Sequence, residues 1–279
     1  MIIGRRLRGI SAFFILASLL YLSVSEEALS QISSHTSTQD GLQLLHKMQE
    51  ALGGTERIAA IRDYEEIVSA KTWNSRGVLA SEVRKRTRWM RSPNLLRLDQ
   101  LGPRDTYVLY FDGTSGSGWE ILPDLKGPEF KTTGTVIELV GGELSFAKGY
   151  LSGFQFNTWL ADRIPGHTVT SPARNVLRID DSDITLDPVT GLPIKTAGVS
   201  LADPSRPVSV EMRYEKWTEV AGVRFPTQRA NYHNDLKLAE ITAEGASIRV
   251  NLGLSAQELA AKPADFMPEI PRKREPQNP

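Results

Sequence analysis

The chain has 279 residues, of which 40% are hydrophobic, enough for one large or two small domains with a core. Its 33 Lys and Arg residues balance its 33 Asp and Glu residues, so the basic excess typical of nucleic-acid-binding proteins is absent. Cysteine is also absent, which excludes disulfides, thiolate metal sites, cysteine nucleophiles and lipid attachment through an N-terminal cysteine.

Residues 1–25 have the pattern of a signal peptide. Three arginines precede an apolar run of 13 residues, Ile10 to Leu22, and the small residues Ser23 to Ser25 form a cleavage site. An uncleaved membrane anchor is the alternative, but the run is shorter than the roughly 20 residues that a spanning helix needs. Cleavage leaves 30 basic and 33 acidic residues, so we expect a nearly neutral protein that is periplasmic or otherwise exported.

The remaining chain divides by composition into three parts. Residues 26–40 are polar and rich in Ser and Thr, which predicts a linker. Residues 41–262 carry regular hydrophobic patterns and form the predicted domain. Residues 263–279 contain five prolines and mixed charge, which predicts a disordered tail.

The domain begins with a predicted helical pair. Apolar residues recur at helical spacing from Leu42 to Leu52, and Gly53-Gly54 ends that helix. A shorter helix follows at Glu56 to Ile61.

From Tyr64 the hydrophobic period changes to two, which is typical of strands. Short turns separate the predicted strands, so neighbours are expected to be antiparallel. The predicted strands before the middle of the chain are Asp63–Trp73, Val78–Arg91, Leu95–Leu101, Thr106–Phe111 and Trp119–Leu122. Those after it are Val176–Asp180, Ile184–Leu186, Ile194–Leu201, Val208–Trp217, Val223–Tyr232, Leu236–Thr242 and Ser247–Val250, and a last helix follows at Ala256–Ala261.

The middle segment, Val136 to Ile164, has helical spacing interrupted by glycines, which predicts short helices. It is the most aromatic part of the chain. Its aromatic residues either fill the core under the sheet or form a movable lid over a pocket, with glycines as hinges.

The central hairpin runs from Pro207 to Tyr232. Its first strand alternates, and we expect Val208, Val210, Met212 and Tyr214 to share one apolar face. Ala221-Gly222 is the predicted turn. With no alternation of strands and helices, the sequence predicts a mainly β, α+β fold: a strongly curved antiparallel sheet forming an incomplete β-barrel covered by short helices. A full barrel or a sandwich is the alternative.

Several segments resemble the LolA-like family of periplasmic lipoprotein carriers. They are ALGGTERIAAIRDY after the first helix, YVLYFDGTSGSGWEI, LDPVTGLPIK and YEKWTEVAGVRFPTQRANY, within Leu42 to Leu252. The resemblance implies an incomplete barrel closed by helices, whose apolar concave face holds acyl chains.

No set of residues predicts catalysis or a metal site. The four histidines lack metal-ligand spacing, and Asp180 to Asp183 lacks the glycine and distal glutamate of a calcium loop. The glycine-rich stretch Gly113 to Gly118 matches neither a phosphate-binding loop nor a nucleophile elbow. The basic run Arg84 to Arg91 is interpreted as a solvated outer face, with contact to an anionic membrane or acidic partner as the alternative.

The sequence therefore predicts a non-enzymatic, monomeric carrier or sensor for a lipid or an acylated protein, without cofactor, metal or nucleic acid. Transient contact with a membrane or membrane protein is also considered. The alternative is a membrane-anchored interaction module with a filled core and no ligand; a hydrolase is disfavoured because no nucleophile is paired with a base. The predicted lining residues are Val208, Val210, Met212, Tyr214, Leu79, Val83, Trp89, Phe154 and Trp159.

Overall fold

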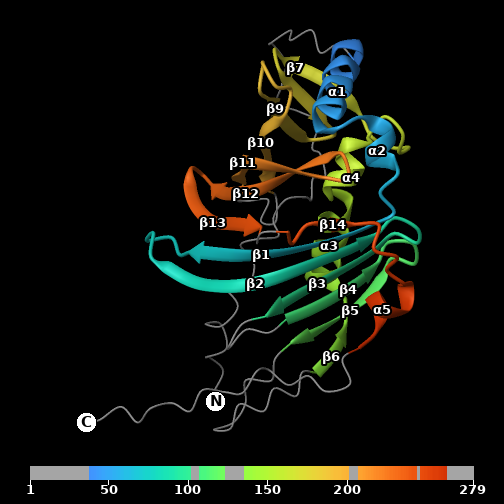
Figure 1. The fold of residues 1–279 in the computed structure, drawn as a ribbon. Coiled ribbons are helices and arrows are strands. Elements are labelled where there is room, and N and C mark those ends of the chain that lie inside the picture. Colours follow the sequence, from blue (N-terminus) through green and yellow to red (C-terminus); the bar gives the residue numbers. More distant parts are fainter. Residues whose placement is uncertain (1–37, 102–106, 123–134, 201–206, 244–245, 263–279) are drawn as a thin grey trace.

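The computed structural model describes residues 38–101, 107–122, 135–200, 207–243 and 246–262 (Figure 1). The predicted signal peptide at 1–25, the predicted tail at 263–279 and most of the predicted linker lie outside these ranges. The last three residues assigned to the linker, 38–40, are already helical, because the first helix begins at Thr38.

The described strands form one open antiparallel sheet. The strands are β1 (Asp63–Trp73), β2 (Leu79–Met90), β3 (Leu95–Leu101), β4 (Tyr107–Asp112), β5 (Ser117–Leu122), β6 (Thr135–Glu138), β7 (Val169–Ala173), β8 (Val176–Ile179), β9 (Ser182–Leu186), β10 (Pro193–Ser200), β11 (Val208–Val220), β12 (Val223–His233), β13 (Leu236–Ala243) and β14 (Arg249–Val250). Their order is β6-β5-β4-β3-β2-β1-β13-β12-β11-β10-β9-β8-β7, and β14 pairs with β1. Among the described residues the two edge strands do not pair with each other, so the predicted open, mainly β sheet is confirmed and the closed barrel and sandwich are not formed.

Five short helices accompany the sheet. They are α1 (Thr38–Leu52), α2 (Thr55–Ala59), α3 (Gly141–Ser152), α4 (Gln155–Trp159) and α5 (Ala256–Ala260). Figure 1 shows α1 beside β7, α3 and α4 behind the sheet, and α5 near β3 to β5. Within the described part of the chain, no helix is both long and apolar enough to cross a membrane.

One face of the sheet, here called the inner face, is the face that α4 covers. Tyr64 of β1 pairs with Trp89 of β2, and both rings contact Phe156 of α4. Side chains alternate along a strand, so residues two apart share a face. Ala70 and Val83 are also paired, six residues from Tyr64 and Trp89, and therefore lie on the inner face too.

The central hairpin continues this inner face into the other half of the sheet. Ile241 of β13 pairs with both Ala70 and Arg229, and Arg229 pairs with Tyr214 of β11. The β11–β12 connection is the predicted Ala221-Gly222 turn, where both residues have positive φ, 51° and 75°. That backbone suits the right-handed twist of a long hairpin.

Two edge strands were not predicted. Thr135 to Glu138 forms β6 instead of the start of a helix, and Val169 to Ala173 forms β7. β6 has four residues, too few for a period to be read, and β7 contains Pro172, which argues against a central strand. Pro172 is tolerated because β7 is an edge strand, with a register irregularity between Thr170 and Ala173.

Candidate ligand-binding face

One part of the inner face is filled by rings, here called the aromatic core. It consists of Tyr64, Trp89, Phe154, Phe156, Trp159 and Phe225. The rings of Trp89 and Phe156 stack with centroids 4.8 Å apart, and Tyr64 meets Phe154 edge-on at 5.8 Å. Such close contacts leave no space for a ligand between these rings, and of the six residues Trp159 alone also lines a cavity.

A second part of the inner face is built from strands alone. Here called the strand cluster, it comprises the buried residues Val68, Ala70, Val83, Met212 and Ile241. Tyr214 and Ala243 pack against it. No residue of a described helix belongs to this cluster, although its side chains are apolar and point to the side that α4 covers elsewhere.

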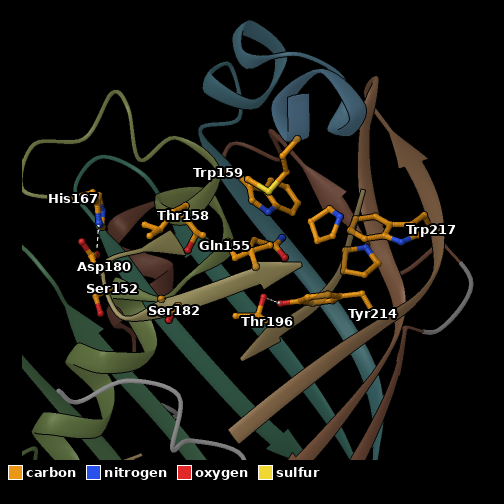
Figure 2. A pocket seen from close by; sticks show the side chains of 16 residues that line it. Ser152, Gln155, Thr158, Trp159, His167, Asp180, Ser182, Thr196, Tyr214 and Trp217 are labelled. Atoms are coloured by element: carbon orange, nitrogen blue, oxygen red, sulfur yellow. Dashed lines mark hydrogen bonds and ion pairs between the residues drawn. The ribbon is translucent and has the colours of Figure 1, made fainter. Parts of the chain in front are cut away.

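A cavity of about 140 Å³ lies next to Tyr214. Its lining draws on α1, α4 and several strands and includes Met48, Trp159, Ile184, Thr196, Tyr214 and Trp217. Figure 2 shows Gln155 and Trp159 near Tyr214 and Trp217 in this cavity. An engineered cavity of about 150 Å³ holds benzene, so this space suits part of a ligand and not a whole lipid.

Two polar groups in the cavity wall differ in their hydrogen bonding. The Tyr214 hydroxyl and Thr196 Oγ1 are 3.0 Å apart and satisfy each other. Among the described residues, the buried Gln155 amide nitrogen has no hydrogen-bond partner. A buried polar group without a partner is costly, so this nitrogen is available to donate to a ligand oxygen.

A neutralised ion pair lies on the inner face between the two apolar regions. Arg229 Nη2 donates to both carboxylate oxygens of Glu66 at 2.7 Å, and both side chains are largely buried. Burial alone would lower the pKa of Arg229, but the Glu66 carboxylate raises it above its ordinary value. Arg229 therefore stays charged, and Glu66 is its counter-ion.

Lys85 is also on the inner face, but no acidic group of the described residues pairs with it. It lies two residues from Val83 on β2 and pairs with Val68 of β1 and Gln100 of β3. None of the hydrogen bonds or ion pairs of the described residues involves its ammonium group. Burial lowers the pKa of Lys85 to about 8, and no neighbouring charge offsets this effect.

Glu120 of β5 is another acidic group on the inner face, and a tyrosine binds it. Tyr107 donates a hydrogen bond of 2.8 Å to Glu120. Burial raises the pKa of Glu120, although the bond from Tyr107 acts in the opposite direction. Glu120 is therefore engaged with Tyr107, and Lys85 experiences no pKa shift from it.

The side chains of the cavity mouth do not form a catalytic triad. His167 Nδ1 is 2.7 Å from Asp180 Oδ2, and Ser152 and Ser182 line the same cavity. Neither serine hydroxyl hydrogen-bonds to His167; that of Ser152 donates to the Gly149 carbonyl. Within the described ranges, no group of three or more His, Asp or Glu residues could hold a metal ion.

The basic run of β2 forms an ion network on the outer face. Asp99 Oδ2 accepts from Arg86 at 3.3 Å and from Arg88 at 2.9 Å, while Arg97 donates to Oδ1 at 3.0 Å. Burial acts to raise the pKa of Asp99, but the three guanidinium groups lower it below its usual value. Arg97 also donates to the carbonyls of Leu259 and Ala261, and thereby holds α5 on this face.

The predicted lining residues fall into three environments. Trp89 and Phe154 belong to the aromatic core, while Val83 and Met212 belong to the strand cluster. Trp159 and Tyr214 line the cavity.

The other three predicted residues lie toward the strand ends. Val210 is buried on the inner face of β11, and Val208 is half-buried at the start of that strand. Leu79 is 50% exposed. A register irregularity lies between Leu79 and Ser81 of β2, so the alternation that holds at Val83 does not extend to Leu79.

Sequence reasoning missed Lys85, Thr196 and Gln155. The sequence pattern groups Lys85 with the arginines of the basic run. However, alternation along the strand places Lys85 on the same face as Val83 and Trp89. This alternation was the available signal. Thr196 and Gln155 carry no such signal, because their proximity to Tyr214 arises from pairing and packing between distant segments.

No protein-family model matches the chain. No curated protein matches its sequence either. Solved structures similar to it include a domain described as an outer-membrane lipoprotein-sorting protein from Vibrio parahaemolyticus, with 13% identity, 80% of this chain and 97% of that chain covered, and a TM-score of 0.49.

A DUF1329 family protein from Desulfovibrio piger has 12% identity over 80% of this chain and 96% of its own, with a TM-score of 0.47. A LolA superfamily protein from Nitrosomonas europaea has 12% identity over 80% and 97%, also with a TM-score of 0.47. LolA-like proteins are the family that the sequence segments resemble.

Proposed function

We propose that this protein is an exported, non-enzymatic carrier or sensor that binds a lipid, or the acyl chain of a lipoprotein, on the inner face. The observation that carries the proposal is the strand cluster. Five apolar side chains from β1, β2, β11 and β13 face the helix side of the sheet, yet no described helix contributes to them. An apolar surface inside an open, curved sheet suits an alkyl chain better than a folded protein surface.

Burial of methylene groups supplies the affinity in this proposal. Each buried methylene is worth about 0.8 kcal/mol, so a sixteen-carbon chain offers on the order of 10 kcal/mol before ordering costs. The lining proposed for the chain is Val83, Met212 and Tyr214, with Val210 at its outer end. The cavity beside Trp159 and Tyr214 receives one end of the ligand.

Movement of α3 and α4 would enlarge that cavity. α3 begins at Gly141, whose φ is 57°, and Gly153 follows its last residue. The helix has no side-chain hydrogen bond at its N-cap. Phe146 and Tyr150 of α3 are only partly buried against the core. Short, uncapped helices between glycines can swing as a lid, and the aromatic core then describes the closed state.

The N-terminal pattern supports export. Its arginines, short apolar run and small-residue site are the features that secretion machinery recognises. A compartment outside the cytoplasm also provides the membrane lipids that such a carrier would collect or sense.

A charge placed in the strand cluster tests the proposal. Met212→Arg, measured with a fluorescent sixteen-carbon fatty acid and delipidated protein, is expected to lower affinity by at least about 100-fold, because the chain would have to bury beside a cation. Val199→Arg is the matched control: Val199 lies on β10, is 46% exposed, and its parity places it on the outer face. It is expected to bind like the wild type.

Met212→Ser keeps the test informative if the arginine variant does not fold. It is expected to fold, as judged by circular dichroism, and to weaken binding by about tenfold, consistent with the loss of apolar contact. Wild-type binding by both Met212 variants, or absence of binding by the wild-type protein, would overturn the proposal.

A further inference from the structure

We propose that Lys85 is the headgroup site of this carrier, and that the ligand is an amphiphile with an alkyl chain on the strand cluster and an acidic group, carboxylate or phosphate, on the Lys85 ammonium. This inference rests on the proposed function and specifies the chemistry of its ligand.

Lys85 lies at the border between apolar and polar residues of the inner face. On β2 it lies between Val83, a member of the strand cluster, and Thr87, and it is opposite Val68, another member. On the other side it is opposite Gln100 of β3, which pairs with Tyr107 of β4. Lys85 therefore lies where the apolar part of the inner face meets a polar row, the arrangement that an amphiphile requires.

The charge balance of the inner face also supports this proposal. The two acidic groups described on the inner face have other partners: Arg229 Nη2 donates to both carboxylate oxygens of Glu66. Glu120 accepts from Tyr107. Among the described residues no acid pairs with Lys85, and burial lowers the pKa of its ammonium to about 8 without opposition.

A partly desolvated cation without a partner destabilises the ligand-free protein, since lysine is seldom buried unless it is paired. An acidic headgroup would supply the missing charge. The ammonium can donate up to three hydrogen bonds, which suits a carboxylate or a phosphate equally. A neutral headgroup would leave the cation uncompensated.

The test compares three probes with the same sixteen-carbon chain: hexadecanoate, hexadecyl phosphate and hexadecanol. Binding to delipidated wild-type protein is measured at pH 7 by displacement of a fluorescent fatty acid. We expect at least one of the acids to bind about 10- to 100-fold more tightly than the alcohol, the range of a charge-assisted hydrogen bond. The tighter acid identifies the source of the headgroup as a fatty acid or a phospholipid.

Lys85→Gln is expected to remove this preference and to leave affinity for hexadecanol unchanged. Arg84→Gln is the matched control, because it removes the same charge from the adjacent residue, which is exposed on the outer face. It is expected to keep the preference.

The outcomes separate the two proposals. Equal binding of all three probes by the wild type, or equal losses in the Lys85 and Arg84 variants, would overturn the headgroup assignment while leaving the carrier intact. Failure of the wild type to bind any of the probes would overturn the carrier proposal itself, and the headgroup assignment with it.

Discussion

The aromatic core and the strand cluster occupy the same face of the same sheet but differ in what packs on them. In the aromatic core, rings from α4 and the segment before it stack on Trp89 and meet Tyr64 and Phe225 edge-on. The side chains of the strand cluster are also apolar, yet no described helix contributes to this cluster. The two regions show that one face of a sheet can be packed by rings from helices in one part and by strand side chains alone in another.

Charged groups on the inner face also differ. Between the two regions, Glu66 and Arg229 form an ion pair. Beside the strand cluster, Lys85 pairs with no acidic group among the described residues. A region selected for stability alone would be expected to pair its charges, so the difference supports a binding role for the strand-cluster side.

The largest expected effect tests the difference in packing between the aromatic core and the strand cluster. Phe156→Ala removes a fully buried ring from the aromatic core and should lower the free energy of unfolding by about 3–5 kcal/mol. Met212→Ala, in the strand cluster, should cost only about 2 kcal/mol, because a smaller and slightly more exposed side chain is removed. Urea unfolding followed by tryptophan fluorescence measures both. Equal costs would show that the strand cluster is as tightly packed as the core.

The buried ion pair gives the second test. Glu66→Gln leaves Arg229 buried without its counter-charge and should cost about 3 kcal/mol. Glu65→Gln, on the opposite face of β1, breaks an ion pair with the more exposed Arg249 and should cost less than about 1 kcal/mol. If the two variants unfold at the same denaturant concentration, the Glu66–Arg229 pair contributes no more to stability than the Glu65–Arg249 pair.

The smallest effect concerns Lys85 in the ligand-free protein. Lys85→Met should stabilise the protein at pH 7 by about 1–2 kcal/mol, since it removes a poorly solvated charge. The pKa of Lys85 is about 8 in the folded protein and 10.5 ordinarily. Between these values the unfolded chain binds more protons, so wild-type stability gains a contribution as pH rises.

The advantage of Lys85→Met should therefore shrink between about pH 8 and pH 10.5. Thermal unfolding of both proteins over that range measures the difference. A pH-independent advantage would mean that the Lys85 ammonium is well solvated in the folded state.

The fold was predictable where the sequence carries a strong local signal. The alternation of β11 and the Ala221-Gly222 turn sufficed to predict the central hairpin, and the open antiparallel sheet followed from short connections. The edge strands β6 and β7 were missed because they are short or contain proline.

The candidate site was predictable only in part. The alternation of side chains along strands predicts that Val83 and Met212 share one face. Alternation does not predict which side chains of that face a helix covers. That depends on where α4 packs, and it is why Trp89 and Phe154 fell into the aromatic core. The significance of Lys85 depends on the absence of a counter-ion among residues far away in the sequence, which no local pattern reveals.

Native mass spectrometry of the protein, purified without detergent from its exported compartment, tests the central claim most directly. We expect a bound mass in addition to that of the chain, and extraction should identify it as a lipid with an acidic headgroup. A spectrum with only the mass of the polypeptide, and no lipid in the organic extract, would contradict the claim that the strand cluster serves a ligand.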